Sequence, residues 1–306
     1  MTRGIYILGN DRVLEATIAL LESIRYYDKD VPVVLLPFND EYQKMATVLG
    51  ERFGVRVFPD MDFYRKMVSE MAAIFPPKFF PVSISLNRMR KFAAWFGDLD
   101  EFLYIDTDIV VFDRIIKVLE EFGDRDFIWC DYQYKSGLKN NYTEVVREKG
   151  VFSEAELQDV FNSGFWGSKK SILTEEKMYD LWRECAQHRE YFDFEQGTDD
   201  QSILNYMVHK FVPNRLNLTT LPEYSAGNWG GSSQFRREGN VLYDGDKKLL
   251  FLHWAGLDLK PGTPYWDLWK FYRYLHDPEP DFPEPEDDRP TLLQKVVNKI
   301  KRLMRY

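Results

Sequence analysis

The chain has 306 residues, 44% of them hydrophobic and 29% charged, which is typical of a soluble globular protein with one large domain or two. The net charge of −9 argues against a general nucleic-acid binder, and no window reaches the roughly 18 uninterrupted apolar residues of a membrane-spanning helix. The first residues, MTRGIYILGNDR, lack the apolar region of a signal peptide. Cys130 and Cys185 form no CxxC pair, so we expect reduced thiols and a cytoplasmic protein.

Strands and helices alternate through the first third of the chain. Apolar, β-branched runs predict strands at 4–8, 32–38, 55–58 and 102–106, and helical periodicity predicts helices at 12–26, 40–52, 62–74 and 83–97. This alternation indicates βαβ units, a mostly parallel sheet and helices on both of its faces. In such sheets ligands bind beyond the carboxyl ends of the strands.

The second half of the chain is less regular. Strands are expected at 126–132, 161–167 and 248–254, and helices at 171–188 and 198–210. We therefore predict a single α/β domain with a Rossmann-like sheet over residues 1–276. Residues 277–290, DPEPDFPEPEDDRP, are acidic and rich in proline, which predicts an extended linker.

Residues 291–306 predict a basic amphipathic helix. Thr291 and Gln294 match a capping box, and the segment carries +5, which leaves −14 on the rest of the chain. A helix of this kind on a linker is typical of a reversible anchor at a membrane surface. A helix that docks on its own domain or on a partner subunit is the alternative. In both cases the apolar face of the helix at 291–306 consists of Leu292, Leu293, Val296, Val297, Ile300, Leu303 and Met304.

Two acidic residues, Asp106 and Asp108, follow the apolar strand FLYI. An unpaired buried carboxylate is costly, so such a group is protonated, hydrogen-bonded or bound to a cation. Residues at i and i+2 of an extended chain point to the same side, so both carboxylates can reach one Mg²⁺ or Mn²⁺. A solvated turn or a helix cap is the alternative for this DxD sequence.

Three later motifs carry polar groups near the ends of predicted elements. Asn-Ser-Gly at 162–164 combines a hydrogen-bonding amide with a glycine that permits close backbone approach, although a bulge or turn would use the same residues. Thr-Asp-Asp-Gln at 198–201 suits a helix N-terminus and also suits a cleft. His253 follows the last strand and precedes Gly256 and Lys260; it suits a structural role or a metal ligand, and Lys260 suits a phosphate.

Together, GND after the first strand, an Arg/Lys-rich helix, YIDTD, NSG, DDQ and the HxxG series resemble family 8 glycosyltransferases of the GT-A fold over roughly residues 4–266. The resemblance implies a metal-dependent, retaining enzyme that moves a hexose from a nucleotide-sugar, commonly a UDP-sugar, to a hydroxyl acceptor. With the C-terminal helix, it points to a glycolipid or glycan acceptor at the inner face of a membrane. The sequence names neither the sugar nor the acceptor.

The resemblance also implies roles for individual residues. Asp106, Asp108 and His253 would bind Mn²⁺ or Mg²⁺. Asn162, Asp200 and Gln201 would line the sugar and acceptor side, with Asp200 and Gln201 positioning or stabilising the reacting centre. The nucleotide-sugar would contact Gly9, Asn10, Asp11, Arg90 (in preference to Arg88 or Lys91), Asp106, Thr107, Asp131, Gly256 and Lys260.

Two features depart from the family pattern. Three residues separate Gly256 from Lys260 where the family has two, and NDRVLEA lacks the aromatic residue usual after the nucleoside loop.

A sugar-phosphate nucleotidyltransferase is a second enzyme class with an acidic metal site, but GNDRVLEA is not its Gly-rich basic loop. A nucleotide-sugar-binding or scaffold protein without turnover is the non-enzymatic alternative.

Overall fold

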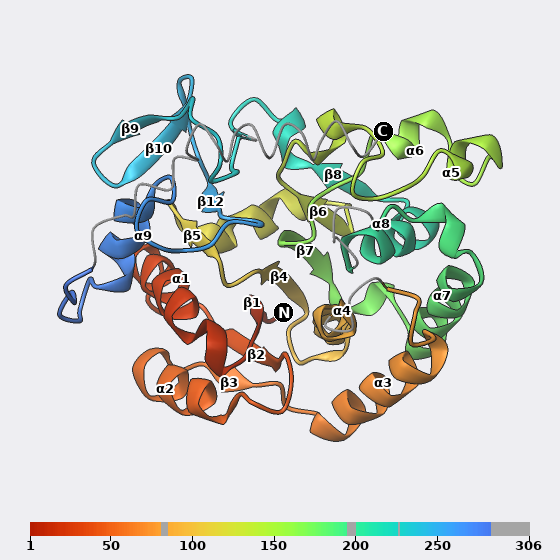
Figure 1. Ribbon diagram of the computed structural model, residues 1–306, viewed down its shortest axis with the longest axis horizontal. Coiled ribbons are helices and arrows are strands. Elements are labelled where there is room, and N and C mark those ends of the chain that lie inside the picture. The colour runs from red at the N-terminus through yellow and green to blue at the C-terminus, as the bar shows by residue number, and fades with distance from the viewer. Residues whose placement is uncertain (81–84, 195–199, 226, 283–306) are drawn as a thin grey trace, which may run out of the picture.

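A seven-stranded sheet forms the centre of the protein in a computed structural model that describes residues 1–80, 85–194, 200–225 and 227–282 (Figure 1). The strand order is β3-β2-β1-β4-β7-β6-β8, and every pairing is parallel except those of β7. The predicted α/β class with a mostly parallel sheet is therefore confirmed. The strands are β1 (Arg3–Gly9), β2 (Val33–Pro37), β3 (Arg56–Val57), β4 (Glu101–Ile105), β6 (Phe127–Trp129), β7 (Phe165–Lys169) and β8 (Arg215–Asn217).

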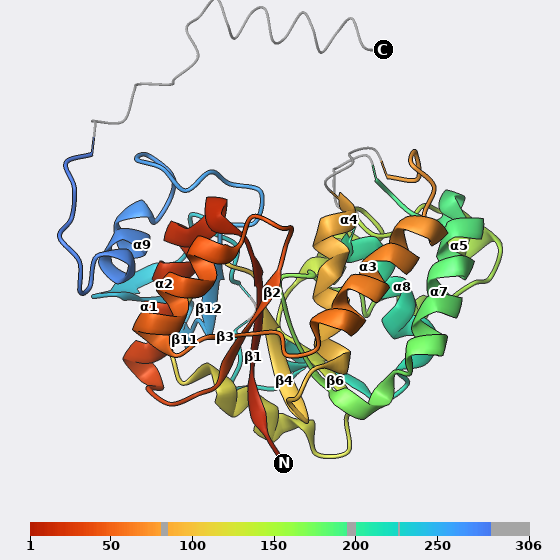
Figure 2. The same cartoon turned by 90° about the horizontal axis from the view of Figure 1, so that it is seen from below.

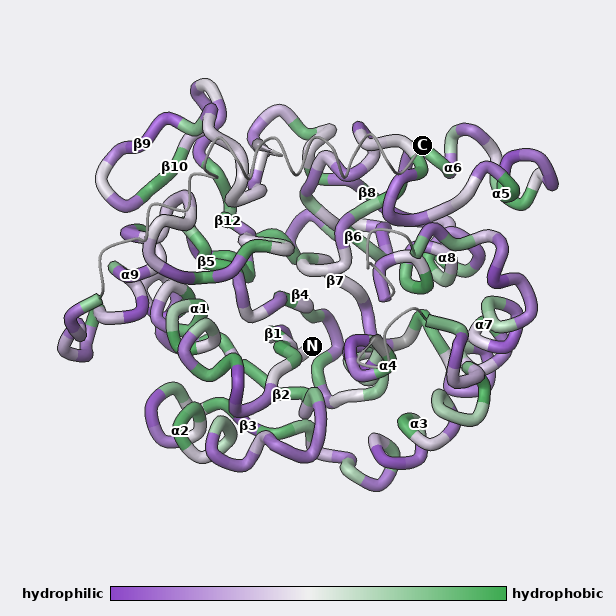
Figure 3. Tube along the Cα trace, viewed as in Figure 1, coloured by the Kyte–Doolittle hydropathy of each residue, from purple (hydrophilic) through white to green (hydrophobic). Residues whose placement is uncertain are grey.

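Helices cover both faces of the sheet, as Figure 2 shows edge-on. One face carries α1 (Leu14–Tyr27) and α2 (Gln43–Phe53), and α9 (Trp266–Arg273) packs beside α1; the other carries α3 (Met61–Ile74), α4 (Ser85–Arg88), α7 (Glu175–Gln187) and α8 (Asp200–Phe211). Successive strand residues point to opposite faces, so Ile5 and Ile7 pack with α1 whereas Tyr6 and Leu8 pack with α3. Figure 3 shows apolar strands inside polar outer helices.

Several elements differ from the sequence-based expectation. The helix expected at 83–97 is the single turn α4 followed by a 3₁₀ helix, η2 (Met89–Phe96), with 83–84 outside the described residues. The strand expected at 248–254 is reduced to β12 (Phe251–His253), which pairs with an unexpected strand, β5 (Ile109–Val111). Also unexpected are the small antiparallel sheet β9 (Arg236–Glu238), β10 (Val241–Asp244) and β11 (Lys247–Lys248), and the single turns α5 (Val145–Glu148) and α6 (Glu154–Leu157).

The first residues of the expected linker pack against the domain. The Asp277 carboxylate lies 2.8 Å from Arg52 and 2.6 Å from Arg273, and the Phe282 ring lies 5.3 Å from that of Trp266. The domain therefore extends to at least residue 282. The remaining linker residues and the helix at 291–306 lie outside the described residues, so their assignments stay predictions. Among the described helices, none has the length and apolar character to cross a bilayer.

Candidate functional site

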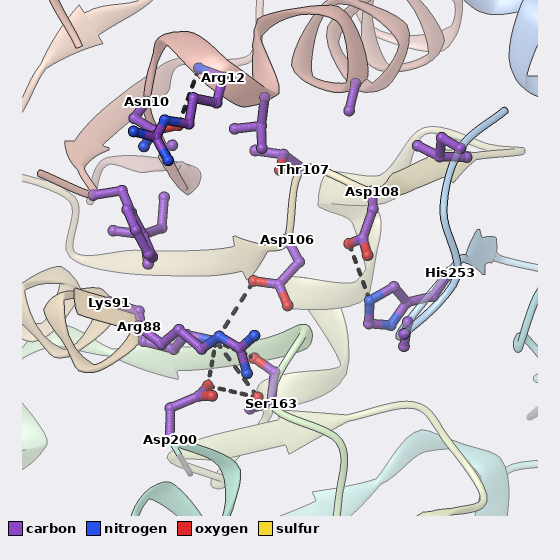
Figure 4. A pocket seen from close by; sticks show the side chains of 18 of the residues that line it. Asn10, Arg12, Arg88, Lys91, Asp106, Thr107, Asp108, Ser163, Asp200 and His253 are labelled. Carbon is purple, nitrogen blue, oxygen red and sulfur yellow. Dashed lines mark hydrogen bonds and ion pairs between the residues drawn. The ribbon is translucent and has the colours of Figure 1, made fainter. Parts of the chain in front are cut away.

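A cavity of about 960 Å³ opens at the carboxyl ends of β1 and β4 (Figure 4). Its walls come from the loop after β1, the α4–η2 segment, the loop after β4, the NSG turn before β7, the start of α8 and the segment after β12. Elements distant in sequence therefore meet at the sheet edge where α/β proteins bind ligands. The polar lining residues include Asn10, Arg12, Arg88, Lys91, Asp106, Thr107, Asp108, Asn162, Ser163, Asp200, Gln201 and His253.

Asp106, Asp108 and His253 converge at the base of the cavity. One potential ligand atom from each lies within 4.8 Å of the other two. The antiparallel pairing of β5 with β12 places His253 opposite Ile109 and hence beside Asp108, whose Oδ1 lies 3.1 Å from His253 Nε2. The two carboxylates predicted to share a cation are thus joined by the expected imidazole.

The charges of this cluster compensate one another. Burial lowers the pKa of His253, but the nearby Asp108 and Asp106 carboxylates outweigh it and raise the pKa overall. Burial raises the pKa of Asp108, and His253 more than reverses that effect. Two carboxylate oxygens and one imidazole nitrogen, facing a space that can admit further oxygen ligands, fit a divalent cation such as Mn²⁺ or Mg²⁺.

Gly164 allows the metal cluster to close. A Cβ at this position would lie 2.3 Å from Cε1 of His253 and 2.9 Å from Oδ2 of Asp106. The pairing of β4 with β7 brings Phe165 opposite Ile105, and the Asp106 amide donates to the Gly164 carbonyl at 2.8 Å. The glycine of the NSG motif therefore permits close approach of two candidate metal ligands.

Lys91 links the metal cluster to the start of α8. Its side chain is buried, and its Nζ lies 2.7 Å from Asp200, 3.5 Å from Asp106 and 3.2 Å from the Ser163 carbonyl oxygen (Figure 4). Burial lowers the pKa of Lys91, but the two carboxylates outweigh it and raise the pKa overall, so the amine is a cation. Lys91 also keeps the pKa of the buried Asp200 carboxyl low, against the effect of its burial.

The cation expected at Arg90 is found instead at neighbouring positions. Arg88 and Lys91 line the cavity, whereas Arg90 is not among the lining residues and its Nη1 lies 3.5 Å from the Pro37 carbonyl oxygen. Arg88 and Lys91 are three positions apart and therefore lie on one side of the helical segment, whereas Arg90 lies on another side.

Gln201 and Asp131 hold the NSG turn from two sides. The Gln201 Oε1 accepts hydrogen bonds from Asn162 Nδ2 at 3.1 Å and from the Ser163 amide at 3.3 Å. The Asn162 amide donates to Asp131 Oδ2 at 2.9 Å. Burial raises the pKa of Asp131 to about 7, although it accepts backbone hydrogen bonds from Gln133 and Asn162. Asp131 lies behind the turn, outside the lining residues.

The expected nucleoside loop lies partly on the cavity. Gly9 and Asn10 line it, but Asp11 points away and accepts a hydrogen bond from the Met45 amide, in the first turn of α2, at 2.8 Å. Gly256 lines the cavity with a φ of +72°, whereas Lys260 is exposed and outside the lining residues. An apolar wall that the sequence did not reveal consists of Val13, Leu257, Leu259 and Trp269.

The comparisons with known proteins agree at the level of fold. No protein-family model and no curated protein matches the chain. Among solved structures, the galactosyltransferase LgtC in complex with donor and acceptor sugar analogues superposes with a TM-score of 0.61 at 14% identity, covering 91% of this chain and 98% of that one. This protein has the GT-A glycosyltransferase fold.

Two further GT-A neighbours are similar over smaller shares of their own chains. The bifunctional glycosyltransferase WbbM gives a TM-score of 0.60 at 16% identity, covering 89% of this chain but only 49% of WbbM. Mouse xyloside xylosyltransferase 1 gives 0.52 at 12% identity, covering 71% of this chain and 85% of that one. These identities describe a likeness of fold, so the roles of single residues in this GT-A protein rest on the geometry above.

Proposed function

We propose that the protein is a metal-dependent, retaining glycosyltransferase that moves a hexose from a nucleotide-sugar, most simply a UDP-sugar, to a glycan or glycolipid hydroxyl. The observation that carries this proposal is the convergence of Asp106, Asp108 and His253 within 4.8 Å at the base of a cavity of about 960 Å³ in a GT-A fold. A nucleoside diphosphate is an anion that such a cation site neutralises.

The proposed division of roles follows the walls of the cavity. Asp106, Asp108 and His253 would hold Mn²⁺ or Mg²⁺, which when bound supplies a Lewis acid for the leaving diphosphate. The loop at Gly9 and Asn10 would receive the nucleoside, with Thr107 and Gly256 also on the cavity. The nucleotide base would pack on the apolar wall formed by Val13, Leu257, Leu259 and Trp269. This wall would take the place of the aromatic residue that the nucleoside loop lacks.

Asp200 would supply a fixed negative charge on the sugar and acceptor side of the cavity. Its Oδ2 lies 2.7 Å from Lys91 Nζ and accepts a hydrogen bond from the Ser163 hydroxyl at 2.8 Å. A carboxylate held in this way stabilises an oxocarbenium-like centre electrostatically without forming a bond to it. Retention proceeds through a covalent intermediate or through attack on the leaving-group face, and this geometry favours the second route, with Asp200 and Gln201 positioning the reacting groups.

The first experiment is thermal unfolding with a panel of nucleotides and nucleotide-sugars, each with and without Mn²⁺. A ligand that binds only the folded protein raises the unfolding midpoint by mass action. We expect one nucleotide to raise the midpoint in the presence of Mn²⁺, and Asp108→Ala to abolish that rise. Sugar release and transfer are then measured with a nucleotide-sugar that carries the selected nucleotide and a radiolabelled sugar.

Asp113→Ala is the matched control for this experiment. Asp113 follows β5, pairs with Lys117 at 2.7 Å and lies outside the catalytic cavity. This variant should keep the Mn²⁺-dependent rise. A folded wild-type protein that responds to no nucleotide would refute the proposal, and so would an Asp108→Ala protein with an undiminished response.

The position of Lys260 supports one alternative, a nucleotide-sugar-binding protein without turnover. Its exposed side chain lies outside the lining residues, so the cavity lacks the cation that the family motif would place on the diphosphate. We expect Arg88 and Lys91 to supply the positive charge instead. Nucleotide binding without any release of labelled sugar, to water or to acceptor glycans, would establish the alternative.

The proposal places the acceptor at the inner face of a membrane. Residues 291–306 carry +5 in a sequence with one apolar helical face, a pattern that favours anionic lipid surfaces. Cosedimentation with phosphatidylglycerol vesicles should fall sharply when Lys295, Lys299 and Lys301 are changed to Glu. Equal sedimentation of both proteins would assign the segment to a contact with protein.

A further inference from the structure

Trp229 is the one tryptophan of the chain whose side chain is exposed. All eight tryptophans lie within the described residues, and the other seven are buried or half-buried, whereas 49% of Trp229 is exposed. It lies in the cyan connection between β8 and β9 in Figure 1. An exposed indole offers a large, rigid apolar surface on which a partner can pack.

The backbone around Trp229 is fixed to a candidate metal ligand. The Gly230 amide donates to the His253 carbonyl at 2.7 Å, and the His253 amide donates to the Asn228 carbonyl at 2.7 Å. The Asn228 Nδ2 donates to the Cys130 carbonyl at 2.8 Å, next to Asp131. This loop therefore spans the carboxyl ends of β6 and β12 at the edge of the catalytic cavity.

The indole is held in one orientation while it is exposed. Its Nε1 donates to the carbonyl of Ala255, a residue that lines the cavity, at 3.1 Å. A Cβ at Gly231 would come within 2.4 Å of the indole ring, so the glycine backbone lies directly against the ring. One part of the indole thus rests on the protein, and the rest faces solvent beside Ala255 of the cavity lining.

We infer that Trp229 is the platform for the acceptor, and that the acceptor presents a pyranose ring there. This inference rests on the proposed glycosyltransferase function. The weakly positive C–H face of a pyranose packs against the negative face of an indole, while the sugar hydroxyls stay in water or turn toward the cavity. Trp229 forms a β-bridge with His253, which in Figure 4 lies across the cavity from Asn10 of the nucleoside loop.

The orientation of the indole favours a sugar over an acceptor hydroxyl on a peptide or a simple alcohol. Its polar Nε1 is already occupied by Ala255, so the indole offers an apolar surface in place of a hydrogen-bond donor. A pyranose matches a flat apolar surface with a ring of C–H groups, whereas a small alcohol has no comparable face. Trp229 is accordingly a specificity residue for the acceptor, and no part of the chemistry passes through it.

The test compares Trp229→Ala, Trp229→Phe and Tyr26→Ala. Tyr26 is a matched control because it is an exposed aromatic residue, 57% exposed, on α1 and outside the cavity. Methyl β-D-glucopyranoside and methyl β-D-galactopyranoside serve as pyranose probes and glycerol as a non-ring hydroxyl probe. Binding is measured by saturation-transfer NMR on protein loaded with Mn²⁺ and UDP, and transfer is measured with the donor selected by the thermal panel.

We expect Trp229→Ala to weaken binding and raise the KM of at least one pyranoside about tenfold, with glycerol unaffected, and Trp229→Phe to remain within about threefold of wild type. The Mn²⁺–UDP thermal shift should be the same in all three variants and wild type. The inference is overturned if Trp229→Ala behaves like Tyr26→Ala toward both pyranosides, if glycerol is lost equally, or if Trp229→Ala loses the Mn²⁺–UDP shift. Absence of a Mn²⁺-dependent shift with every nucleotide of the panel in wild type would instead refute the proposed function.

Discussion

Substitution of Gly164 by alanine tests whether the candidate metal cluster depends on close packing. The new Cβ would lie 2.3 Å from His253 Cε1 and 3.0 Å from Asn162 Oδ1. Carbon atoms in contact prefer about 3.5 Å, so the imidazole must retreat by about 1.2 Å or the backbone must shift. Either movement separates His253 from Asp106 and Asp108. Overpacking of this kind costs about 1–3 kcal/mol of folding free energy.

The substitution should weaken metal binding in addition to lowering stability. Displacement of the groups that orient metal ligands weakens affinity by about 10–100-fold. Mn²⁺ at about 100 times its wild-type Kd stabilises the folded protein by about 2.7 kcal/mol, and the same concentration stabilises the variant by about 0.4–1.4 kcal/mol. Calorimetric titration with Mn²⁺ and thermal unfolding with and without Mn²⁺ measure both effects.

Gly167→Ala is the control for overpacking alone. Gly167 lies three residues further along, in β7, where a Cβ would approach the Ile128 side chain at 2.8 Å and the Leu103 side chain at 3.1 Å, in the core. This variant should lose stability while its Mn²⁺ affinity stays at the wild-type value. The reasoning is wrong if Gly164→Ala binds Mn²⁺ as tightly as Gly167→Ala.

Three further predictions concern the charged groups of the site. Lys91→Met leaves the Asp200 carboxylate buried without its amine partner, so the free energy of unfolding in urea should fall by about 3–5 kcal/mol. The double variant Lys91→Met/Asp200→Asn should recover part of this loss. A loss below about 1 kcal/mol in Lys91→Met would contradict a buried ion pair. Because burial raises the pKa of Asp131 to about 7, the unfolded chain ionises this carboxyl at lower pH than the folded chain does. The stability of wild type relative to Asp131→Asn should therefore fall by up to about 1.4 kcal/mol per pH unit from pH 5 to 7 and level off above pH 7; a flat difference in urea unfolding would refute this. Chelation by EDTA should abolish transfer, and Mn²⁺ should restore it in wild type but not in Asp108→Ala.

Local sequence patterns predicted the parallel strands β1 to β4 and one part of the site, but not the parallel strand β8. The alternation of strands and helices up to Ile105 needs only periodicity, which the chain retains from β1 to β4. The cost of placing Asp106 and Asp108 at the end of a buried strand pointed to a cation without any tertiary information. Asn162, Asp200, Gln201 and His253 also line the cavity as expected from the resemblance.

The remaining features depend on pairings that no local pattern encodes. The direction of β7 decides that the NSG turn meets Asp106, and a five-residue strand reads alike in either direction. Arg88 and Lys91, three positions apart, share one side of a helical segment in either helix type, and only tertiary packing decides that this side, and not that of Arg90, meets the cavity. Trp269 reaches the cavity from α9, whose packing beside α1 is a tertiary contact.

The antiparallel strand β7 also bears on when the site forms during folding. Phe165 pairs with Ile105 across 60 residues of chain, and the Asp106 amide then donates to the Gly164 carbonyl. Pairings between residues so distant in sequence form slowly, because the loop between them must close before any contact stabilises it. The strands β1, β2 and β3 can assemble earlier from neighbouring segments. Recovery of Mn²⁺ binding after dilution from urea would therefore time the joining of the two halves of the molecule.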